Sequence, residues 1–269
     1  MNQQDQIKND KSHRLELPSL SVVVPCFNED AGIEQLSNKL SELKQDYGNL
    51  MHFEFIFVDD GSTDHTWAQL EKYFLDWSDA ILVQHEENRG LMAAVQTGFG
   101  QASNEFLFSM DSDCTYCPLQ IPEFIPILQR ESVGVVTGSP YHPDGAVLNV
   151  PKWRITISKT ASWLYSFLLR NKLHCYTSMF RGWKKSAIEE IELNETGYAG
   201  TVEILWSIEQ RGWDIDELPS VLNVRKYGQS KMRLLKVIRG HLKFMLRLLF
   251  RRVTGRRSKL TPLAVEQKN

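Results

Sequence analysis

FLFSMDSDCTYC, residues 106–117, joins an apolar run to two aspartates that stand one residue apart, Asp111 and Asp113. An apolar run of this kind is typical of a strand that is buried on both faces. The two carboxylates would then lie at the carboxyl end of the strand, where open α/β sheets bind their ligands. Two anionic oxygen donors at such a place suit a divalent cation that also carries substrate phosphates. The alternative is a solvated turn, so the motif has to be weighed with the rest of the chain.

Three strand-to-helix units precede this stretch. Each begins with a short β-branched or aromatic run and continues through a polar turn into apolar residues spaced three or four apart. The predicted strands cover residues 22–24, 53–58 and 81–83. Strands that alternate with helices in this way form βαβ units and a mostly parallel sheet with helices on both sides. We therefore predict an α/β fold whose first half has the character of a nucleotide-binding domain.

The composition is that of one large domain with an unequal charge distribution. The chain has 269 residues, of which 42% are hydrophobic. Residues 225–269 carry 14 Lys and Arg against one acid, whereas residues 1–224 carry 17 against 32. A basic tail on an acidic body indicates an anionic surface or substrate as partner. No nucleic acid is expected as a partner, and the sequence leaves the oligomeric state open.

The cysteines and the N-terminus bear on the compartment. The four cysteines are scattered through apolar segments, which suits a reducing compartment better than a disulfide framework. Cys114 and Cys117 form a single C-x-x-C, but zinc would need two further ligands. The first residues lack the apolar core of a signal peptide, and no uninterrupted apolar stretch is long enough to predict a membrane span. We expect residues 1–18 to be polar and disordered, and the protein to be cytoplasmic.

Four blocks of the first half carry a resemblance to a known family. SVVVPCFNED, FIFVDDGSTDHT, ENRGLMAAVQTGFG and FSMDSDCTY resemble, in this order and spacing, the N-terminal motifs of family 2 glycosyltransferases with the GT-A fold. The resemblance implies a GT-A domain over residues 19–231 and a nucleotide-sugar donor, GDP-mannose or a UDP-hexose. The implied donor-binding residues are Pro25, Phe27, Glu29, Asp60 and Asp111, and the implied ligands of Mg²⁺ or Mn²⁺ are Asp111 and Asp113.

The second half is similar to the polyprenyl-phosphate, or dolichol-phosphate-type, mannosyl- and glucosyltransferases of the same family. Arg154 and Ser158 stand four residues apart in a predicted helix, so they share a face and would converge on one anion. With VRKYGQSK at residues 224–231, the resemblance implies catalytic roles for two arginines beside the two aspartates, and a site for the phosphate of a polyprenyl-phosphate acceptor. The implied catalytic residues are Asp111, Asp113, Arg154 and Arg225, and the implied acceptor-phosphate residues are Arg154, Ser158, Arg225 and Lys231. The chain departs from the group's pattern at Thr115, where a glutamine is usual, and near Pro140, where an arginine is usual.

The acceptor decides the reaction. A lipid phosphate is already ionised and needs no general base, whereas a hydroxyl acceptor would need a positioned carboxylate. We predict inverting transfer of one sugar to a polyprenyl phosphate, since QRGW at residues 210–213 is not the Q-x-x-R-W of processive synthases. One alternative is transfer to a hydroxyl of a lipid or cell-surface glycan, with Glu203 or Glu195 as the base. Another is an inactive nucleotide-sugar-binding module docked on a membrane.

The C-terminal segment MRLLKVIRGHLKFMLRLLFRRV, residues 232–253, predicts a basic amphipathic helix over residues 232–255. Apolar and basic residues each recur every three or four positions on separate stripes. The apolar stripe contains Leu235, Ile238, Leu242, Met245, Leu249 and Val253, and the basic stripe contains Arg233, Lys236, Arg239, Lys243, Arg247 and Arg251. We expect this helix to lie peripherally on the anionic cytoplasmic face of a membrane, followed by a flexible tail at residues 256–269. The alternative is that its apolar stripe packs on the catalytic domain.

Overall fold

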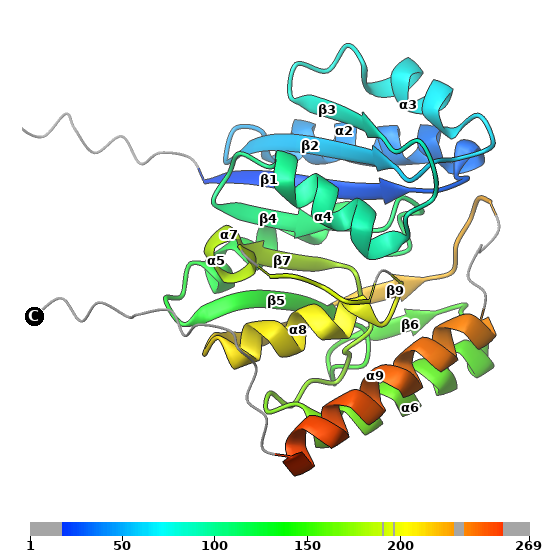
Figure 1. The fold of residues 1–269 in the computed structure, drawn as a ribbon. Coiled ribbons are helices and arrows are strands. Elements are labelled where there is room, and N and C mark those ends of the chain that lie inside the picture. Colours follow the sequence, from blue (N-terminus) through cyan, green and yellow to red (C-terminus); the bar gives the residue numbers. More distant parts are fainter. Residues whose placement is uncertain (1–17, 190, 196, 229–233, 255–269) are drawn as a thin grey trace, which may run out of the picture.

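A seven-stranded sheet forms the centre of the protein, with helices on both of its faces (Figure 1). The computed structural model describes residues 18–189, 191–195, 197–228 and 234–254. The strands are β1 Ser19–Cys26, β2 His52–Asp59, β3 Ala80–Gln84, β4 Phe106–Ser109, β5 Val133–Ser139, β6 Ala146–Leu148, β7 Arg181–Lys184, β8 Asp214–Pro219 and β9 Val221–Asn223. The helices are η2 Asp30–Gly32, α2 Ile33–Tyr47, α3 Thr66–Phe74, α4 Leu91–Gln101, η3 Pro118–Phe124, α5 Ile125–Leu128, α6 Lys152–Leu168, α7 Lys185–Ile188, α8 Gly200–Gln210 and α9 Leu234–Thr254.

The predicted mostly parallel α/β sheet is confirmed. Its strand order is β3-β2-β1-β4-β7-β5-β8, and a separate pair, β6 and β9, lies beside it. Strand β1 pairs in parallel with β2 and with β4, and β7 is the antiparallel strand between β4 and β5. The chain runs outward from β1 to β3 and then returns to the other side of β1 as β4. The connections after β1 and β4 therefore diverge, and such a point in an open sheet is where ligands bind.

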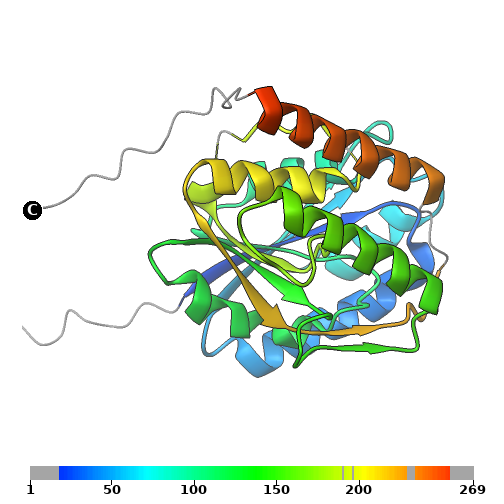
Figure 2. The same ribbon diagram turned by 90° about the horizontal axis from the view of Figure 1, so that it is seen from below.

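Alternating side chains of the strands divide the core into two layers. Val22 and Val24 of β1 belong to the apolar cluster that includes α2, α3 and α5, whereas Val23 belongs to the cluster that includes α4, α8 and α9. This alternation follows from the two-residue period of a strand. The strands read as continuous apolar runs because helices cover both faces (Figures 1 and 2).

The C-terminal helix α9 packs on the domain along one side, next to α6 (Figures 1 and 2). Phe244, Met245 and Leu248 are buried in the core, while Leu242 and Leu249 are exposed. The predicted apolar stripe is therefore divided between the core and the surface. The structure does not describe residues 1–17 or 255–269. The predictions of a disordered N-terminus over residues 1–18 and of a flexible tail over residues 256–269 therefore fall outside the described chain, except at residue 18. In the part that the structure describes, no helix combines the length and the apolar character that crossing a membrane requires.

Candidate active site

Strand β4 places the two aspartates of the organising motif. All four of its residues are buried, and it pairs with β1 on one side and β7 on the other, which confirms the predicted two-sided burial. The chain leaves the sheet after Ser109 and turns through Cys114, whose φ of 51° is in the left-handed region. The backbone N–H of Thr115 donates to Asp113 Oδ1 at 3.1 Å, which fixes one oxygen of that carboxylate. Asp111 and Asp113 thus lie beyond the carboxyl end of a central strand.

Arg225 joins this motif to the end of β1. Its Nε donates to Asp113 Oδ2 at 2.8 Å, and its two terminal nitrogens donate to the two oxygens of Glu29 at 3.0 and 3.2 Å. The side chains of Asp113 and Glu29 are each 11% exposed, so this is a largely desolvated charge cluster. Burial acts to lower the pKa of Arg225, yet Asp113 and Glu29 together raise the pKa above its ordinary value. Arg225, predicted to bind an acceptor phosphate, therefore binds two carboxylates that are predicted to serve the donor and the metal ion.

The surroundings of Asp111 raise the pKa of its carboxyl group. Burial, and then the neighbouring charge of Asp113, raise its pKa from 3.8 to about 7, while Arg225 opposes the shift. Two carboxylates that repel each other favour a cation between them, because the cation removes their mutual repulsion. Within the described ranges, no group of three or more His, Cys, Asp and Glu side chains is arranged to hold a metal ion. The pair therefore suits an ion that takes its remaining ligands from substrate phosphates.

The loop after β1 is held against the loop after β2. Pro25 is buried as part of β1, and Phe27 is half-buried just beyond it. The backbone N–H of Glu29 donates to Thr66 Oγ1 at 2.7 Å, and Asn28, with a φ of 55°, accepts from the Thr63 N–H at 2.8 Å. These bonds place the Glu29 carboxylate beside Arg225. Pro25, Phe27 and Glu29 thus lie at the end of β1, whereas their predicted contacts with a donor stay predictions.

Asp60 has its carboxylate engaged inside the protein. It is 3% exposed, and its oxygens accept hydrogen bonds from His85, Asn88 and the backbone N–H groups of Arg89 and Gly90 at 2.7–2.9 Å. These bonds give Asp60 a positioning role in the ligand-free structure, and its predicted contact with a donor stays a prediction. It ties the second sequence block, which contains Asp60, to the third, which contains Asn88. The two blocks are therefore one structural unit.

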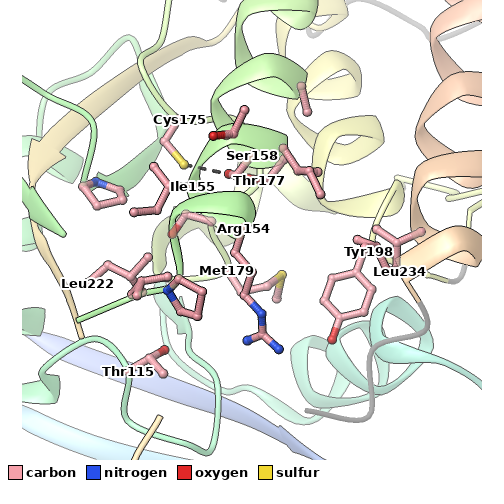
Figure 3. Close-up of a pocket in the computed structure, with 18 of the residues that line it drawn as sticks. Thr115, Arg154, Ile155, Ser158, Cys175, Thr177, Met179, Tyr198, Leu222 and Leu234 are labelled. Carbon is pink, nitrogen blue, oxygen red and sulfur yellow. Dashed lines mark hydrogen bonds between the residues drawn. The ribbon is translucent and has the colours of Figure 1, made fainter. Parts of the chain in front are cut away.

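A cavity of about 840 Å³ opens from the aspartates toward α6 and α9. Its polar end contains Asp111, Asp113, Thr115, Tyr198 and Arg225. Its other end is an apolar groove between the two helices. The groove is lined by Ile157, Ala161 and Leu164 of α6 and by Val237, Ile238, Leu242 and Met245 of α9. Figure 3 shows this cavity with the residues that project into it. One continuous cavity thus joins the Asp111 and Asp113 pair to the apolar groove between α6 and α9.

Arg154 and Ser158 both line the cavity from α6, as their spacing predicts, but they point to different parts of it (Figure 3). Ser158 Oγ lies 2.9 Å from Thr177 Oγ1, whereas the Arg154 guanidinium extends toward the end where Tyr198 lies. In this structure the two groups therefore do not converge on one point. Lys231 lies outside the described residues. Tyr198 and Tyr141, which also line the cavity, have no motif in the sequence that marks them.

Glu203, a candidate base for a hydroxyl acceptor, is committed to the scaffold. It is 2% exposed and accepts hydrogen bonds from the N–H groups of Asn194 and Glu195 at 2.9 and 2.7 Å. Arg247 of α9 lies 3.2 Å from it and also pairs with Glu195. Neither glutamate lines the 840 Å³ cavity. The structure therefore places both predicted bases away from the cavity and in contact with α9.

The mostly parallel sheet, the loops at its switch point and the acid pair define an α/β protein with its candidate ligand site at the carboxyl ends of the strands. Comparison with known proteins gives the family. The description "Glycosyl transferase family 2" matches residues 21–192, and the chain belongs to that family.

Among curated relatives, the chain is similar to dolichol-phosphate mannosyltransferase of Pyrococcus furiosus. The two are 30% identical over 232 residues, which cover 86% of this chain and 63% of that protein. Polyprenol monophosphomannose synthase of Mycolicibacterium smegmatis is 28% identical, with 78% of this chain and 80% of that protein covered. Dodecaprenyl-phosphate galacturonate synthase of Rhizobium johnstonii is 31% identical, with 69% and 52% covered. The chain thus spans less than two thirds of the Pyrococcus and Rhizobium relatives.

Solved structures establish the fold. Glucosyl-3-phosphoglycerate synthase from Mycobacterium tuberculosis, in complex with Mn²⁺, uridine diphosphate and glucosyl-3-phosphoglycerate, superposes with a TM-score of 0.60 at 20% identity. The match covers 87% of this chain and 80% of that one. The same enzyme in complex with Mg²⁺ and uridine diphosphate gives a TM-score of 0.59 at 22% identity, over 89% and 82% of the chains. The predicted GT-A fold is confirmed.

Proposed function

We propose that this protein is a metal-dependent, inverting glycosyltransferase that moves one sugar from a nucleotide-sugar donor to the phosphate of a polyprenyl-phosphate lipid. The observation that carries the proposal is the continuous cavity. It has carboxylates at one end, with the Arg154 guanidinium directed toward the part where Tyr198 lies, and an apolar groove between α6 and α9 at the other end. An anionic head with a long apolar tail is the kind of molecule that such a space fits. The names of the three relatives, each of which refers to a phosphorylated prenol and a sugar, support the same acceptor class.

The donor would bind at the ends of β1 and β4. Pro25, Phe27 and Glu29 would surround the base and the ribose. The Glu29 carboxylate could accept hydrogen bonds from ribose hydroxyls and base N–H groups. Asp111 and Asp113 would hold Mg²⁺ or Mn²⁺ together with the diphosphate. When bound, the ion neutralises charge on the departing nucleoside diphosphate. Asp60 supports the site indirectly through the Asn88 to Gly90 turn.

The transfer is a single displacement. An oxygen of the acceptor phosphate attacks the anomeric carbon, and a new carbon–oxygen bond forms as the bond to the nucleoside diphosphate breaks. The electron pair of the broken bond leaves with the diphosphate, so the configuration at the anomeric carbon inverts. The acceptor is already an anion and no proton has to be removed. Arg154 would orient the acceptor phosphate through charge-assisted hydrogen bonds.

The opening of the groove suits a lipid that remains in its membrane. Beside the groove, α6 and α9 expose large apolar side chains, and α9 exposes basic ones. The apolar set is Trp153, Trp163, Phe167, Leu235, Leu242, Leu246, Leu249 and Phe250, and the basic set is Lys236, Arg239, Lys243 and Arg252. Aromatic and basic side chains together are typical of proteins that lie in a membrane interface. We extend the proposal to peripheral attachment on the anionic cytoplasmic face.

Transfer to a sugar hydroxyl is the second candidate. It would need a carboxylate base, and both predicted candidates, Glu203 and Glu195, are bonded to Arg247 and lie away from the cavity. These contacts favour the phosphate acceptor over the hydroxyl acceptor.

A kinetic comparison of two arginine variants tests the proposal. With a polyprenyl phosphate and a radiolabelled nucleotide sugar, Arg154→Ala is expected to raise the KM for the lipid by roughly 10-fold or more, because a charge-assisted hydrogen bond is lost. The KM for the nucleotide sugar should change little. Arg130→Ala is the matched control, since Arg130 makes an exposed ion pair with Asp216 outside the cavity. Equal KM values for the lipid in Arg154→Ala and Arg130→Ala would contradict the assignment.

A further inference from the structure

Tyr198 faces the cavity from the loop that precedes α8. Its side chain lines the polar end of the cavity together with Asp111, Asp113 and Arg225, and the residue is 37% exposed. Figure 3 shows the Tyr198 hydroxyl and the Arg154 guanidinium directed into the same part of the cavity. Among the described residues, no side chain or backbone group makes a hydrogen bond with that hydroxyl. An unused donor therefore projects into the place where charged ligand groups would meet.

The surroundings of Tyr198 raise the pKa of its hydroxyl above the ordinary value of a phenol. Burial, and then the charge of Asp111, raise the pKa of Tyr198 to about 12, with Arg225 acting in the opposite direction. A neutral phenol at neutral pH donates one hydrogen bond and carries no charge of its own. It therefore adds no repulsion to an anion that enters beside the acid pair.

The backbone around Tyr198 is fixed by its neighbours. The carbonyl oxygen of Tyr198 accepts a hydrogen bond from Thr201 Oγ1 at 2.7 Å, and the Gly200 N–H donates to the Gly197 carbonyl at 2.9 Å. A Cβ on Gly200 would lie 2.5 Å from the Met92 side chain, so the start of α8 is pressed closely against α4. Hydrogen-bonded and close-packed backbone holds a side chain in a preset direction.

We infer that the Tyr198 hydroxyl donates a hydrogen bond to a phosphate oxygen of the bound ligand, on the opposite side of that phosphate from Arg154. This inference rests on the proposed function, because it takes a phosphate to bind between the aspartates and Arg154. Two phosphates could supply the oxygen, namely the acceptor phosphate of the lipid or the diphosphate of the donor. The hydroxyl comes from the loop before α8 and the guanidinium from α6, so together they bracket an anion from two directions.

Tyr198→Phe removes only the hydroxyl and tests the inference. Because that hydroxyl has no partner in the described chain, the variant should melt at the same temperature as the wild type. We expect it to weaken binding of one phosphate ligand by roughly 10-fold or more, the usual range for a hydrogen bond to a charged group. Two readouts are measured, the KM for polyprenyl phosphate and the Kd for the nucleoside diphosphate with Mn²⁺ by calorimetry. Tyr73→Phe on α3 is the control for loss of a tyrosine hydroxyl outside the cavity.

The outcomes separate the two sources and the two proposals. A raised KM for the lipid with unchanged nucleotide binding supports the inference and assigns the lipid phosphate. A raised Kd for the nucleoside diphosphate supports it and assigns the donor. If both constants equal those of the Tyr73→Phe control, the inference is overturned, even if kcat falls. If the wild type itself does not use a polyprenyl phosphate, the proposed function fails first, and the calorimetric arm still decides whether Tyr198 binds the donor.

Discussion

Arg225 holds together two carboxylates that come from distant parts of the chain. It is separated from Glu29 by 196 residues and from Asp113 by 112, yet it donates to both within 3.2 Å. Without a cation nearby, Glu29, Asp111 and Asp113 would repel one another, so Arg225 stabilises the ligand-free site. An entering metal ion would offer Asp113 a second positive partner. Arg225→Ala is therefore expected to disturb donor binding as well as acceptor binding, unlike Arg154→Ala.

At Asp113 the prediction concerns charge. Asp113→Asn keeps the size of the side chain and removes the negative charge that would face the cation. We expect turnover to fall on the order of 10²–10³-fold, as is typical when one positioned electrostatic group is lost. Binding of a nucleoside diphosphate, measured by calorimetry, should lose its dependence on Mn²⁺. Near-normal turnover of the variant in the presence of a chelator would show that the aspartates do not hold a metal ion.

At Asp111 the prediction concerns pH. Its pKa in the folded protein is about 7, above the ordinary 3.8, so between these values the folded state binds more protons than the unfolded chain. Stability of the metal-free protein should therefore fall as pH rises through this window. A divalent cation prefers the ionised carboxylate, so the rise in Tm produced by Mn²⁺ with a nucleoside diphosphate should grow between pH 6 and pH 8. In Asp111→Asn the rise in Tm should no longer increase between pH 6 and pH 8. An equal rise in the Tm of the wild type at both pH values would contradict a role for ionised Asp111 in binding the cation.

The sequence predicts those residues of the candidate site that lie in local patterns. It does not predict contacts that depend on the tertiary fold. Asp111 and Asp113 were predictable, because a buried strand and its following turn are encoded within 12 residues. The pairing of Arg225 with Glu29 depends on the tertiary fold and has no local signature. Tyr198 was missed because a single tyrosine before a helix resembles any other. The hydrogen bonds that Asp60 makes with residues 85–90 also depend on the tertiary fold, whereas its predicted contact with a donor stays a prediction.

At the scale of elements, α9 is fastened to α8 and to the loop before it by a largely buried ionic contact. Arg247 pairs with Glu195 and Glu203, and His241 Nδ1 lies 2.8 Å from the Tyr165 hydroxyl of α6. Burial lowers the pKa of His241 to about 4, so this histidine is neutral at physiological pH. The loop fastened in this way continues to Tyr198. The position of α9 and the shape of the active site are therefore linked through short chains of contact.

Replacing Glu203 tests that link. Glu203→Gln removes the charge opposite Arg247 and leaves one amide oxygen to accept the Asn194 and Glu195 N–H groups. We expect a loss of about 1–3 kcal/mol in the free energy of unfolding, the usual cost of a disrupted buried hydrogen-bonding group. Hydrogen exchange should become faster in α9 and in residues 191–195. Lys243→Ala, an exposed site on the same helix, is the control. If exchange in α9 is unchanged in Glu203→Gln, the ionic contact does not fasten the helix.

The spacing of apolar residues in α9 predicts the helix but not which side chains are buried. The spacing of apolar residues predicted a helix, and Leu234–Thr254 is helical. Periodicity does not say what covers the apolar stripe. In the structure, Phe244 and Leu248 enter the core, while Leu242 and Leu249 remain exposed. Deleting the helix would open the core, so point substitutions on its exposed side are the better test of a membrane role.

On the scale of the whole molecule, the charge asymmetry predicts binding to anionic membranes. We expect the triple variant Lys236→Glu, Arg239→Glu and Lys243→Glu to bind anionic liposomes roughly 100-fold more weakly than the wild type, at about 1 kcal/mol per cation. The wild-type affinity should itself fall with rising salt, since exposed charges are screened. Co-sedimentation at low and high ionic strength measures both effects.

The control for this test lies on the other face of the sheet. Lys72→Glu changes the charge on α3, which belongs to the opposite apolar layer from α9. It should leave liposome binding unchanged at low salt. If the control loses about one third as much binding free energy as the triple variant, in proportion to one charge reversal against three, net charge alone determines attachment and the α9 surface does not.

In the proposed reaction the nucleophile is a lipid phosphate that needs no base. The most direct test supplies the wild-type protein with Mn²⁺, a radiolabelled nucleotide sugar and one of two acceptors, a polyprenyl phosphate or the corresponding polyprenol. The two lipids differ only in the phosphate. We predict label transfer to the polyprenyl phosphate and none to the polyprenol above the level without acceptor. Transfer to the polyprenol at a comparable rate would contradict a phosphate nucleophile and would require a catalytic base in the active site.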